Sequence, residues 1–173
     1  MKGKIIMAKK EENKGKDEVI ENLAKSQKGV TATESLLGSI AWLMLRSQIH
    51  KHLFITDLEW LIIPPVMLKQ MRIFRNQNTP IGYISWASLT QEAEERFLKG
   101  NARISPKDWN AGDRLWIIDF ISPFGAGNQF LKLVQEQIFK DKDIKILKLK
   151  KDGRGMEGVL LKDFLSSIGK EKK

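Results

Sequence analysis

The sequence predicts one α+β domain, with a single mixed, mainly antiparallel sheet flanked by helices. Strand-like and helix-like segments follow one another in the order strand, strand, helix, strand, helix, strand, and residues 115–121 form an almost continuous apolar run. A length of 173 residues with 42% hydrophobic and 29% charged residues suits one globular domain. We expect a flexible charged N-terminal tail over residues 1–30, the folded domain over residues 31–168 and a basic tail over residues 169–173.

The N-terminal third predicts helices. Residues 18–28 form a weak helical pattern, and a stronger one begins behind Thr33 as N-cap and runs to about Arg46. A second short helix is expected from Thr56 to Ile63, ending at Pro64-Pro65, because proline disfavours helical dihedrals in the residue before it. The apolar residues of the stronger helix recur at helical spacing: Leu36, Leu37, Ile40, Leu43 and Met44.

The middle of the chain predicts a β-hairpin followed by a helix. Two strand-like runs, Met71 to Arg75 and Ile81 to Ala87, flank residues 76–80, which are rich in turn formers. Residues 90–99 have helical propensity behind a Thr or Ser cap. Residues 105–108 begin with Ser and Pro, which is typical of a one-turn helix start.

The rest of the chain predicts a central strand and the elements that cover it. Residues 115–121 suit a strand buried on both faces. A helix is expected from Asn128 to Phe139 and a strand from Ile144 to Leu149. A last amphipathic helix before Gly169 is expected to carry Val159, Leu160, Phe164, Leu165 and Ile168.

Charge and composition narrow the function classes. The net charge is +9, but the excess of lysine and arginine lies at the two ends, and residues 31–139 are nearly neutral. This distribution disfavours a nucleic-acid groove on the folded core, although basic ends can hold an acidic partner. The chain has no cysteine, which excludes cysteine nucleophiles and disulfides. It has no apolar run of about 18 residues, so we expect no membrane span and a soluble, cytoplasmic protein.

A carboxylate inside the apolar run is the first candidate functional group. Asp119 interrupts a strand that is otherwise apolar, and a buried carboxylate is costly unless a cation or hydrogen-bond donors satisfy it. A structural salt bridge, for example to Arg114, is one interpretation. A role in the chemistry of a site is the other.

The two histidines are the second candidate. His50 and His52 lie in a polar segment between two apolar helices, and histidine is the usual general acid or base near neutral pH. Ser47, three residues before His50, is placed to bond the imidazole, to act as a nucleophile, or simply to end the helix. Two histidines without a clustered third ligand make a poor metal site. No glycine motif suggests a nucleotide, so neither metal nor organic cofactor is expected.

Four segments of the chain form a distinctive pattern: Gly38 to Leu43, Ser47 to Lys51, Gly82 to Ala87 and Asp108 to Gly125. With these segments the chain resembles the toxin-activating lysine acyltransferases that modify RTX haemolysins and leukotoxins before export. The resemblance runs from about Leu37 to Leu149, and Leu53-Phe54 stands where that family commonly has a Trp-Pro pair. It implies a sheet like that of the GNAT acyltransferases and assigns His50 and Asp119 as the essential catalytic residues.

The resemblance also implies a reaction and partners. A fatty acyl group would pass from acyl carrier protein, a co-substrate, to internal lysines of a protoxin. His50 would be the base, and Asp119 would either orient His50 or act on the lysine directly. Arg114 would position Asp119 or face the carrier's phosphopantetheine, and Ser47 would support the pair. A homodimer is a further expectation.

Two alternatives remain open at the level of sequence. A secreted peptide toxin in place of an RTX protoxin is compatible with the core motifs. A catalytically inactive relative, acting as a toxin chaperone or a basic nucleic-acid-binding module, is the alternative from another functional class.

Overall fold

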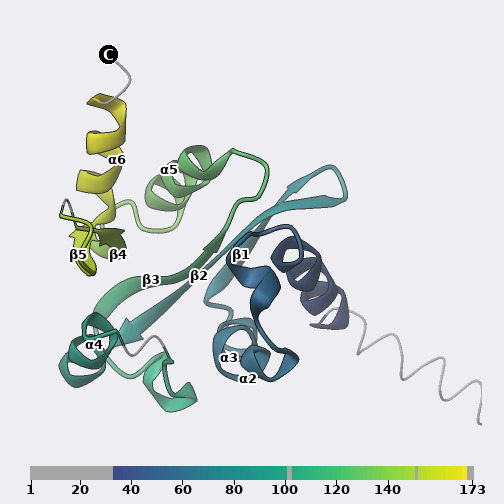
Figure 1. Ribbon diagram of the computed structural model, residues 1–173, viewed down its shortest axis with the longest axis horizontal. Coiled ribbons are helices and arrows are strands. Elements are labelled where there is room, and N and C mark those ends of the chain that lie inside the picture. The colour runs from purple at the N-terminus through teal and green to yellow at the C-terminus, as the bar shows by residue number, and fades with distance from the viewer. Residues whose placement is uncertain (1–32, 101–102, 151, 171–173) are drawn as a thin grey trace, which may run out of the picture. The chain divides into compact units, whose positions relative to one another are not determined.

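A computed structural model describes residues 33–100, 103–150 and 152–170 of the chain (Figure 1). The chain divides between Gly38 and Ser39 into two units, and every strand belongs to the second. Residues 33–44 are helical, in agreement with the helix expected behind Thr33. The expected tail over residues 1–30 and the weak helix over residues 18–28 lie outside the described residues.

The second unit is built on one five-stranded sheet with the strands in sequence order. The pairs β1–β2, β2–β3 and β4–β5 are antiparallel, and β3–β4 is parallel. This arrangement confirms the expected α+β class with a mixed, mainly antiparallel sheet, and it is consistent with a GNAT-like fold. The strands are β1 (Met71–Asn76), β2 (Thr79–Leu89), β3 (Arg114–Ile121), β4 (Ile144–Leu149) and β5 (Met156–Leu160).

The predicted hairpin is confirmed, with a tighter turn than expected. Asn76 pairs with Thr79, so the connection between β1 and β2 is two residues long. Gln77 in this turn has a φ of 53°, the left-handed conformation that two-residue hairpin turns of this kind require. Asn76, Thr79 and Pro80, which were expected to belong to the connection, therefore lie in the two strands.

An irregularity between β2 and β3 interrupts the alternation of side chains just before Asp119. Ser85 pairs with Asp119 and the next residue, Trp86, pairs with Ile117, so Ile118 is an extra residue in β3. Residues two apart in a regular strand share a face, but a bulge residue breaks this alternation. Ile117 therefore faces the same side as Trp86, and Asp119 faces the opposite side with Ser85.

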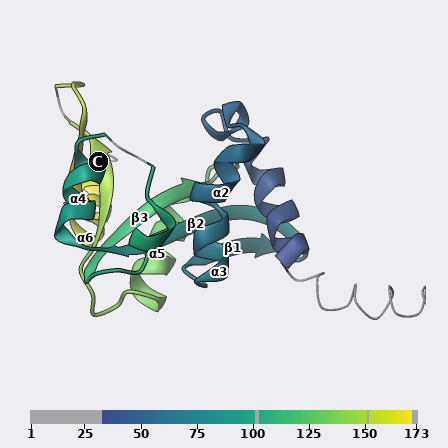
Figure 2. The same cartoon turned by 90° about the horizontal axis from the view of Figure 1, so that it is seen from below.

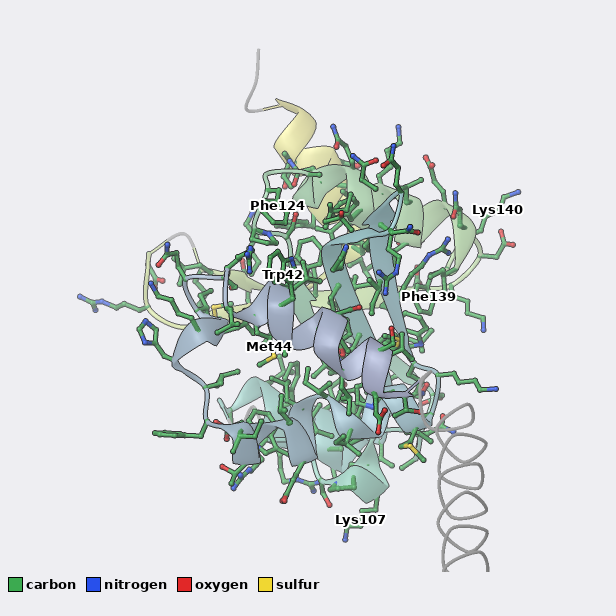
Figure 3. The ribbon with its side chains drawn as sticks, turned by 90° about the vertical axis from the view of Figure 1, so that its right-hand side faces the viewer. Trp42, Met44, Lys107, Phe124, Phe139 and Lys140 are labelled. Atoms are coloured by element: carbon green, nitrogen blue, oxygen red, sulfur yellow. The ribbon has the colours of Figure 1, made fainter. Side chains whose placement is uncertain are left out.

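Helices cover both faces of the sheet (Figures 1 and 2). On one face, α5 (Gly127–Gln137) and α6 (Leu161–Lys170) pack over the apolar cluster that contains Ile84 and Ile117. The opposite face is covered by α4 (Gln91–Leu98) and by the segment that precedes β1. Figure 3 looks onto this second face, where the end of the first helical run, with Trp42 and Met44, crosses in front of the strands.

The segment before β1 departs from the prediction at its prolines. The structure has η2 (Ile55–Asp57), α2 (Leu58–Leu61) and α3 (Ile63–Met67), and α3 contains Pro64 and Pro65. The expectation that helix stops at this pair was wrong. Proline is tolerated in the first turn of a helix, where its missing N–H has no partner to lose, so the pair begins a new helix after a break at Ile62.

The C-terminal region holds a second correction. Val159 and Leu160 were expected on the last helix, but they lie in β5 and pair with Ile146 and Lys145 of β4. Strand β4 offers an edge with unpaired backbone groups, and pairing satisfies them. The helix α6 begins at Leu161 and continues through Gly169 to Lys170 instead of ending before the glycine.

The remaining short elements follow the sequence signals. The Ala93 N–H donates to the Thr90 side-chain oxygen at 3.2 Å, so Thr90 is the N-cap of α4. The one-turn helix expected near residue 106 is η3 (Pro106–Asp108), and η1 (His50–His52) follows the first helical run. None of the helices in the described parts of the chain is long and apolar enough to cross a membrane.

Candidate active site

His50 is buried at the start of η1 although the residues beside it are exposed. Its exposed fraction is 8%, whereas that of Ile49 is 79%. The Ser47 Oγ lies 2.6 Å from His50 Nδ1 and also accepts the His50 backbone N–H at 3.5 Å. A serine hydroxyl that bonds a nearby residue in this way stabilises a tight turn. Ser47 therefore fixes both the backbone and the ring of His50.

Asp119 meets His50 from the central strand. The His50 Nε2 lies 2.7 Å from Asp119 Oδ1, and the Phe120 backbone N–H donates to the same oxygen at 2.8 Å. Asp119 is 8% exposed, so this contact is screened from water. Because a carboxylate accepts and does not donate, the proton of this bond belongs to Nε2. In the neutral form of the ring, the lone pair of Nδ1 then faces the Ser47 hydroxyl.

The second oxygen of Asp119 lies in a buried polar region whose hydrogen-bonding capacity is not used. Among the described residues, Asp119 Oδ2, the Tyr83 hydroxyl and Ser85 Oγ are buried without a hydrogen-bond partner. Tyr83 and Ser85 lie on the same face of the sheet as Asp119, and Ser85 pairs directly with Asp119. Burial, together with the nearby Asp119 carboxylate, raises the pKa of Tyr83, so its phenol stays neutral at physiological pH.

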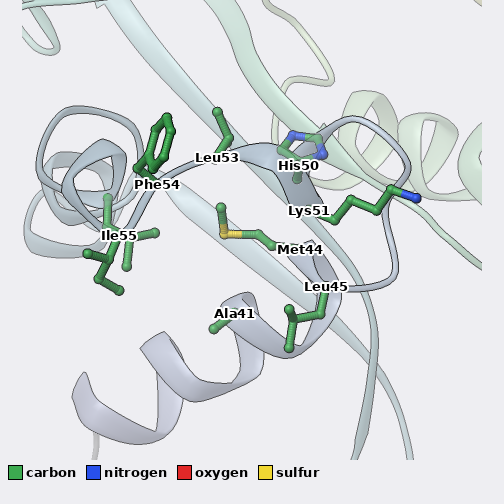
Figure 4. Close-up of a pocket in the computed structure, with 9 residues that line it drawn as sticks. Ala41, Met44, Leu45, His50, Lys51, Leu53, Phe54 and Ile55 are labelled. Carbon is green, nitrogen blue, oxygen red and sulfur yellow. The ribbon is translucent and has the colours of Figure 1, made fainter.

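His50 lies between two cavities of different character. The first has a volume of about 300 Å³ and is mainly apolar, with Met44, Leu53 and Phe54 among its lining residues (Figure 4). The second has a volume of about 450 Å³ and is lined in part by Ser47, Gln48 and Ser122. Ser47 lines the second cavity and does not line the first. The Nδ1 side of the ring is therefore the side of the more polar cavity.

The structure brings three of the four predicted site residues together. Ser47, His50 and Asp119 form one continuous hydrogen-bonded chain, whereas Arg114 lies in another cluster. Arg114 donates to Glu94 Oε2 at 2.8 Å and to Gln91 Oε1 at 3.3 Å. The salt bridge considered for Asp119 is thus made with His50. In the described part of the chain, no group of three or more His, Asp or Glu side chains is arranged to hold a metal ion.

Sequence reasoning missed the second buried carboxylate. Glu94 on α4 is 6% exposed, and it accepts from Trp116 Nε1 at 2.7 Å, from Lys145 Nζ at 2.8 Å and from Arg114. Burial alone would raise the pKa of Glu94. The hydrogen bonds from Lys145 and Trp116, with the charges of Lys145 and Arg114, outweigh burial and lower it. Several acidic residues in one helical turn suggest a solvated face, so the sequence carried no signal for this burial.

Comparison with known proteins gives this geometry a context. The model of the RTX toxin acyltransferase family matches residues 30–160. An RTX-II toxin-activating lysine-acyltransferase of Actinobacillus pleuropneumoniae is 38% identical over 120 residues, which cover 68% of this chain and 75% of that protein. A leukotoxin-activating lysine-acyltransferase of a Pasteurella haemolytica-like species is 36% identical over 102 residues, covering 59% and 62%. A protein-lysine myristoyltransferase of Kingella kingae is 37% identical over 107 residues, covering 62% and 64%.

The mixed sheet, the buried histidine–carboxylate pair and the lysine acyltransferases that it resembles define the chain as an enzyme of the acyltransferase class. Within that class, the chain belongs to the RTX toxin acyltransferase family. The family match includes Ser47, His50 and Asp119. It ends at the last residue of β5.

Proposed function

We propose that this chain transfers a fatty acyl group from the thioester of acyl carrier protein to the side-chain nitrogen of an internal lysine in an RTX protoxin. The observation that carries the proposal is the buried chain from Ser47 through His50 to Asp119, at the wall that two cavities share. The relatives named as toxin-activating lysine acyltransferases support the acceptor class.

The reaction needs a base and a path for one proton. Lysine has an ordinary pKa of about 10.4, so its side chain is almost wholly an ammonium ion at neutral pH, and it first gives one proton to water to become a nucleophilic amine. The amine nitrogen then forms a bond to the thioester carbonyl carbon, and the carbon–sulfur bond breaks. The second proton that the nitrogen loses passes to His50, and from His50 to the departing thiolate of the carrier, so the products are an amide and a thiol.

Each of the three residues has a role that fits its contacts. Asp119 holds the Nε2 proton of His50, which fixes the tautomer and stabilises the imidazolium formed when Nδ1 accepts a proton. His50 is the general base through Nδ1. Ser47 is a positioning residue, because its contacts to the His50 ring and backbone are those of a local turn.

The two cavities suggest how the substrates approach. The proton-accepting nitrogen faces Ser47, which lines the more polar cavity, so we assign that side to the lysine amine. Acyl carrier proteins are acidic, and the lysine-rich ends of this chain give them long-range attraction. No further cofactor is required, and the reaction belongs in the cytoplasm, where acyl carrier protein and an unexported protoxin are both present.

The experiment is a reconstituted transfer reaction. The purified chain is incubated with myristoyl–acyl carrier protein and the RTX-II protoxin, the class of acceptor named for one of the relatives, and the protoxin is analysed by intact mass and peptide mapping. The expected result is a myristoyl increment on lysine, which a folded His50→Gln variant does not produce.

The opposite result has a defined meaning. If the wild-type chain binds protoxin tightly, yet adds no increment to it or to other RTX protoxins, the chain is a binding partner of the toxin and not its acyltransferase. Circular dichroism of the His50→Gln variant provides the control for folding.

A further inference from the structure

The apolar cavity next to His50 has the character of a ligand site. Its volume of about 300 Å³ lies at the lower end of the range for small-molecule pockets, which are mostly apolar with a few polar groups. His50 and Lys51 supply polar atoms at one end. The other lining residues are apolar: Ala41, Met44, Leu45, Leu53, Phe54, Ile55 and Leu58.

Several of these apolar side chains are strongly exposed to water. The exposed fraction is 69% for Leu45, 77% for Phe54 and 80% for Ile55. A single exposed apolar residue needs no explanation, but several around one hollow mark a binding surface. In Figure 4, Ala41 and Leu45 come from the first helical run, Phe54 and Ile55 lie across from them, and Met44 is between the two sides.

The exposed wall is held in place by specific bonds. The Asp57 Oδ2 accepts the Phe54 backbone N–H at 2.9 Å, and Asp57 Oδ1 accepts the Trp60 indole N–H at 3.0 Å. These two hydrogen bonds lower the pKa of Asp57, the Trp60 bond most, so the carboxylate is ionised at neutral pH. The backbone at Phe54 is therefore held in place at the edge of the cavity that Phe54 and Ile55 line.

We infer that this cavity binds the fatty acyl chain of the donor, with the thioester at His50 and the methyl end toward Phe54 and Ile55. The inference rests on the proposed acyl transfer and adds the location of the chain. His50 closes one end of the cavity, so a chain that lies there puts its carbonyl beside the base. The second cavity also has apolar lining from Ile49, Phe120 and Pro123, but it is the more polar of the two because Arg46, Ser47 and Gln48 line it as well, and burying such groups against an alkyl chain is costly.

Photo-crosslinking locates the chain without requiring transfer. The full-length protein is mixed with acyl carrier protein that carries a myristoyl chain with a diazirine near its methyl end, irradiated, digested and mapped by mass spectrometry. We expect the label within residues 41–58, and chiefly on Phe54 or Ile55. A label on the residues of the second cavity, on another surface, or on no residue of the chain contradicts the inference.

Chain-length dependence gives a second, kinetic test. Each methylene buried from water contributes about fourfold in affinity, so kcat/KM should rise with donor length while the cavity fills. Ala41→Phe places a ring in the cavity. It should lower kcat/KM for the myristoyl donor about tenfold or more and leave the octanoyl donor within about threefold.

A matched pair of leucines controls for general loss of apolar surface. Leu45→Ala should raise KM for the myristoyl donor several-fold, because Leu45 lines the cavity. Leu149→Ala should leave it unchanged, because Leu149 is 58% exposed on β4 and lines none of the cavities described. Equal effects of the two substitutions would overturn the inference.

The two proposals fail in different ways. Transfer by the wild-type chain with the label outside residues 41–58 would preserve the acyltransferase and reject the cavity as the acyl site. A label within residues 41–58 without transfer to any protoxin would preserve the cavity and reject the proposed reaction.

Discussion

Two buried carboxylates on the same chain have opposite surroundings. Glu94 is 6% exposed, and both of its oxygens accept hydrogen bonds, from Trp116, Lys145 and Arg114. Asp119 is 8% exposed, and one oxygen accepts two bonds while the other has no partner among the described residues. Burial alone therefore does not distinguish the two groups. The difference lies in how completely each is satisfied.

The two clusters also differ in the kind of donor they contain. Glu94 forms salt bridges of 2.8 Å with both Arg114 and Lys145, so its charge is neutralised within one cluster of fixed partners. Asp119 is bonded to a histidine, the side chain most often used as a general acid or base, and that histidine lines two cavities. A carboxylate with fixed partners stabilises the fold, whereas one bonded to a titratable ring beside open space is suited to chemistry.

Asp119→Asn should give the largest effect and is the strongest test of this comparison. The amide removes the negative charge that stabilises the His50 imidazolium, and it can donate to Nε2, which selects the wrong tautomer. Transfer of the acyl group should fall by about 10³-fold or more, as expected for a histidine–aspartate pair. The measurement is single-turnover transfer, with thermal unfolding to establish that the variant is folded.

Glu94→Gln should lower stability and leave the rate of acyl transfer nearly unchanged, which is the opposite of the effect expected for Asp119→Asn. The variant leaves Lys145 and Arg114 without a charged acceptor, so the free energy of unfolding at pH 7 should fall by about 2 kcal/mol. The value of kcat/KM below the unfolding temperature should stay close to that of the wild type. A large loss of turnover in a folded Glu94→Gln variant would mean that the two carboxylates are not separate in function.

The pH dependence of the Glu94 effect follows from the direction of its pKa shift. The folded pKa is lowered, so the stabilising contribution is fully present above the unfolded value of about 4.3 and is lost as the pH falls through the folded pKa. The difference in the free energy of unfolding between the wild type and Glu94→Gln should therefore have its full size at pH 7. It should become smaller as the pH falls below about 4. Urea unfolding across this range measures it.

Ser47→Ala should have an intermediate effect on activity. If Ser47 positions His50, its removal should lower kcat by about tenfold, which is in the range of one lost hydrogen bond to the ring. Burst kinetics distinguish this role from that of a nucleophile. Loss as complete as in His50→Gln, together with an acyl-enzyme trapped in the wild type on Ser47, would assign the serine to covalent catalysis instead.

Tyr83→Phe should give the smallest effect. The Tyr83 hydroxyl is buried and makes no hydrogen bond of full geometry among the described residues, so its removal deletes at most a weak contact with Ser85. The free energy of unfolding should change by less than about 1 kcal/mol. A decrease of more than about 2 kcal/mol in the free energy of unfolding, measured by chemical denaturation, would show that the hydroxyl has a hydrogen-bond partner in solution. The polar groups around Asp119 would then be more completely hydrogen-bonded than the comparison implies.

Much of the site could be predicted because its signals are local in the sequence. Asp119 stands out as a charge within an apolar strand, and Ser47 and His50 are separated by one helical turn. The separation of 69 positions between His50 and Asp119 hides their contact from any local pattern. That pairing came from the family resemblance, and the structure supplies its geometry.

Other features could not be predicted because they depend on tertiary contacts. Val159 and Leu160 suit a helix or a strand, and the free edge of β4 decides for the strand. The burial of Glu94 depends on Lys145, 51 residues away. The apolar cavity joins the end of one helical segment to the turn at Phe54, and neither segment is unusual alone.

The extra residue in β3, Ile118, has no partner in β2, so the strand could lose one residue there and keep the pairing on both sides. Removing either member of the Ile117-Ile118 pair yields the same shortened sequence, in which the remaining isoleucine opposes Trp86 and Asp119 still opposes Ser85. The facing of the carboxylate would survive, and the bend that a bulge introduces would be lost. That bend follows directly after Leu115 and Trp116, the residues through which β3 pairs with β4. Deleting one isoleucine is therefore expected to change how β3 diverges from β4 while the direction of the Asp119 side chain stays the same. No single substitution can separate these two properties.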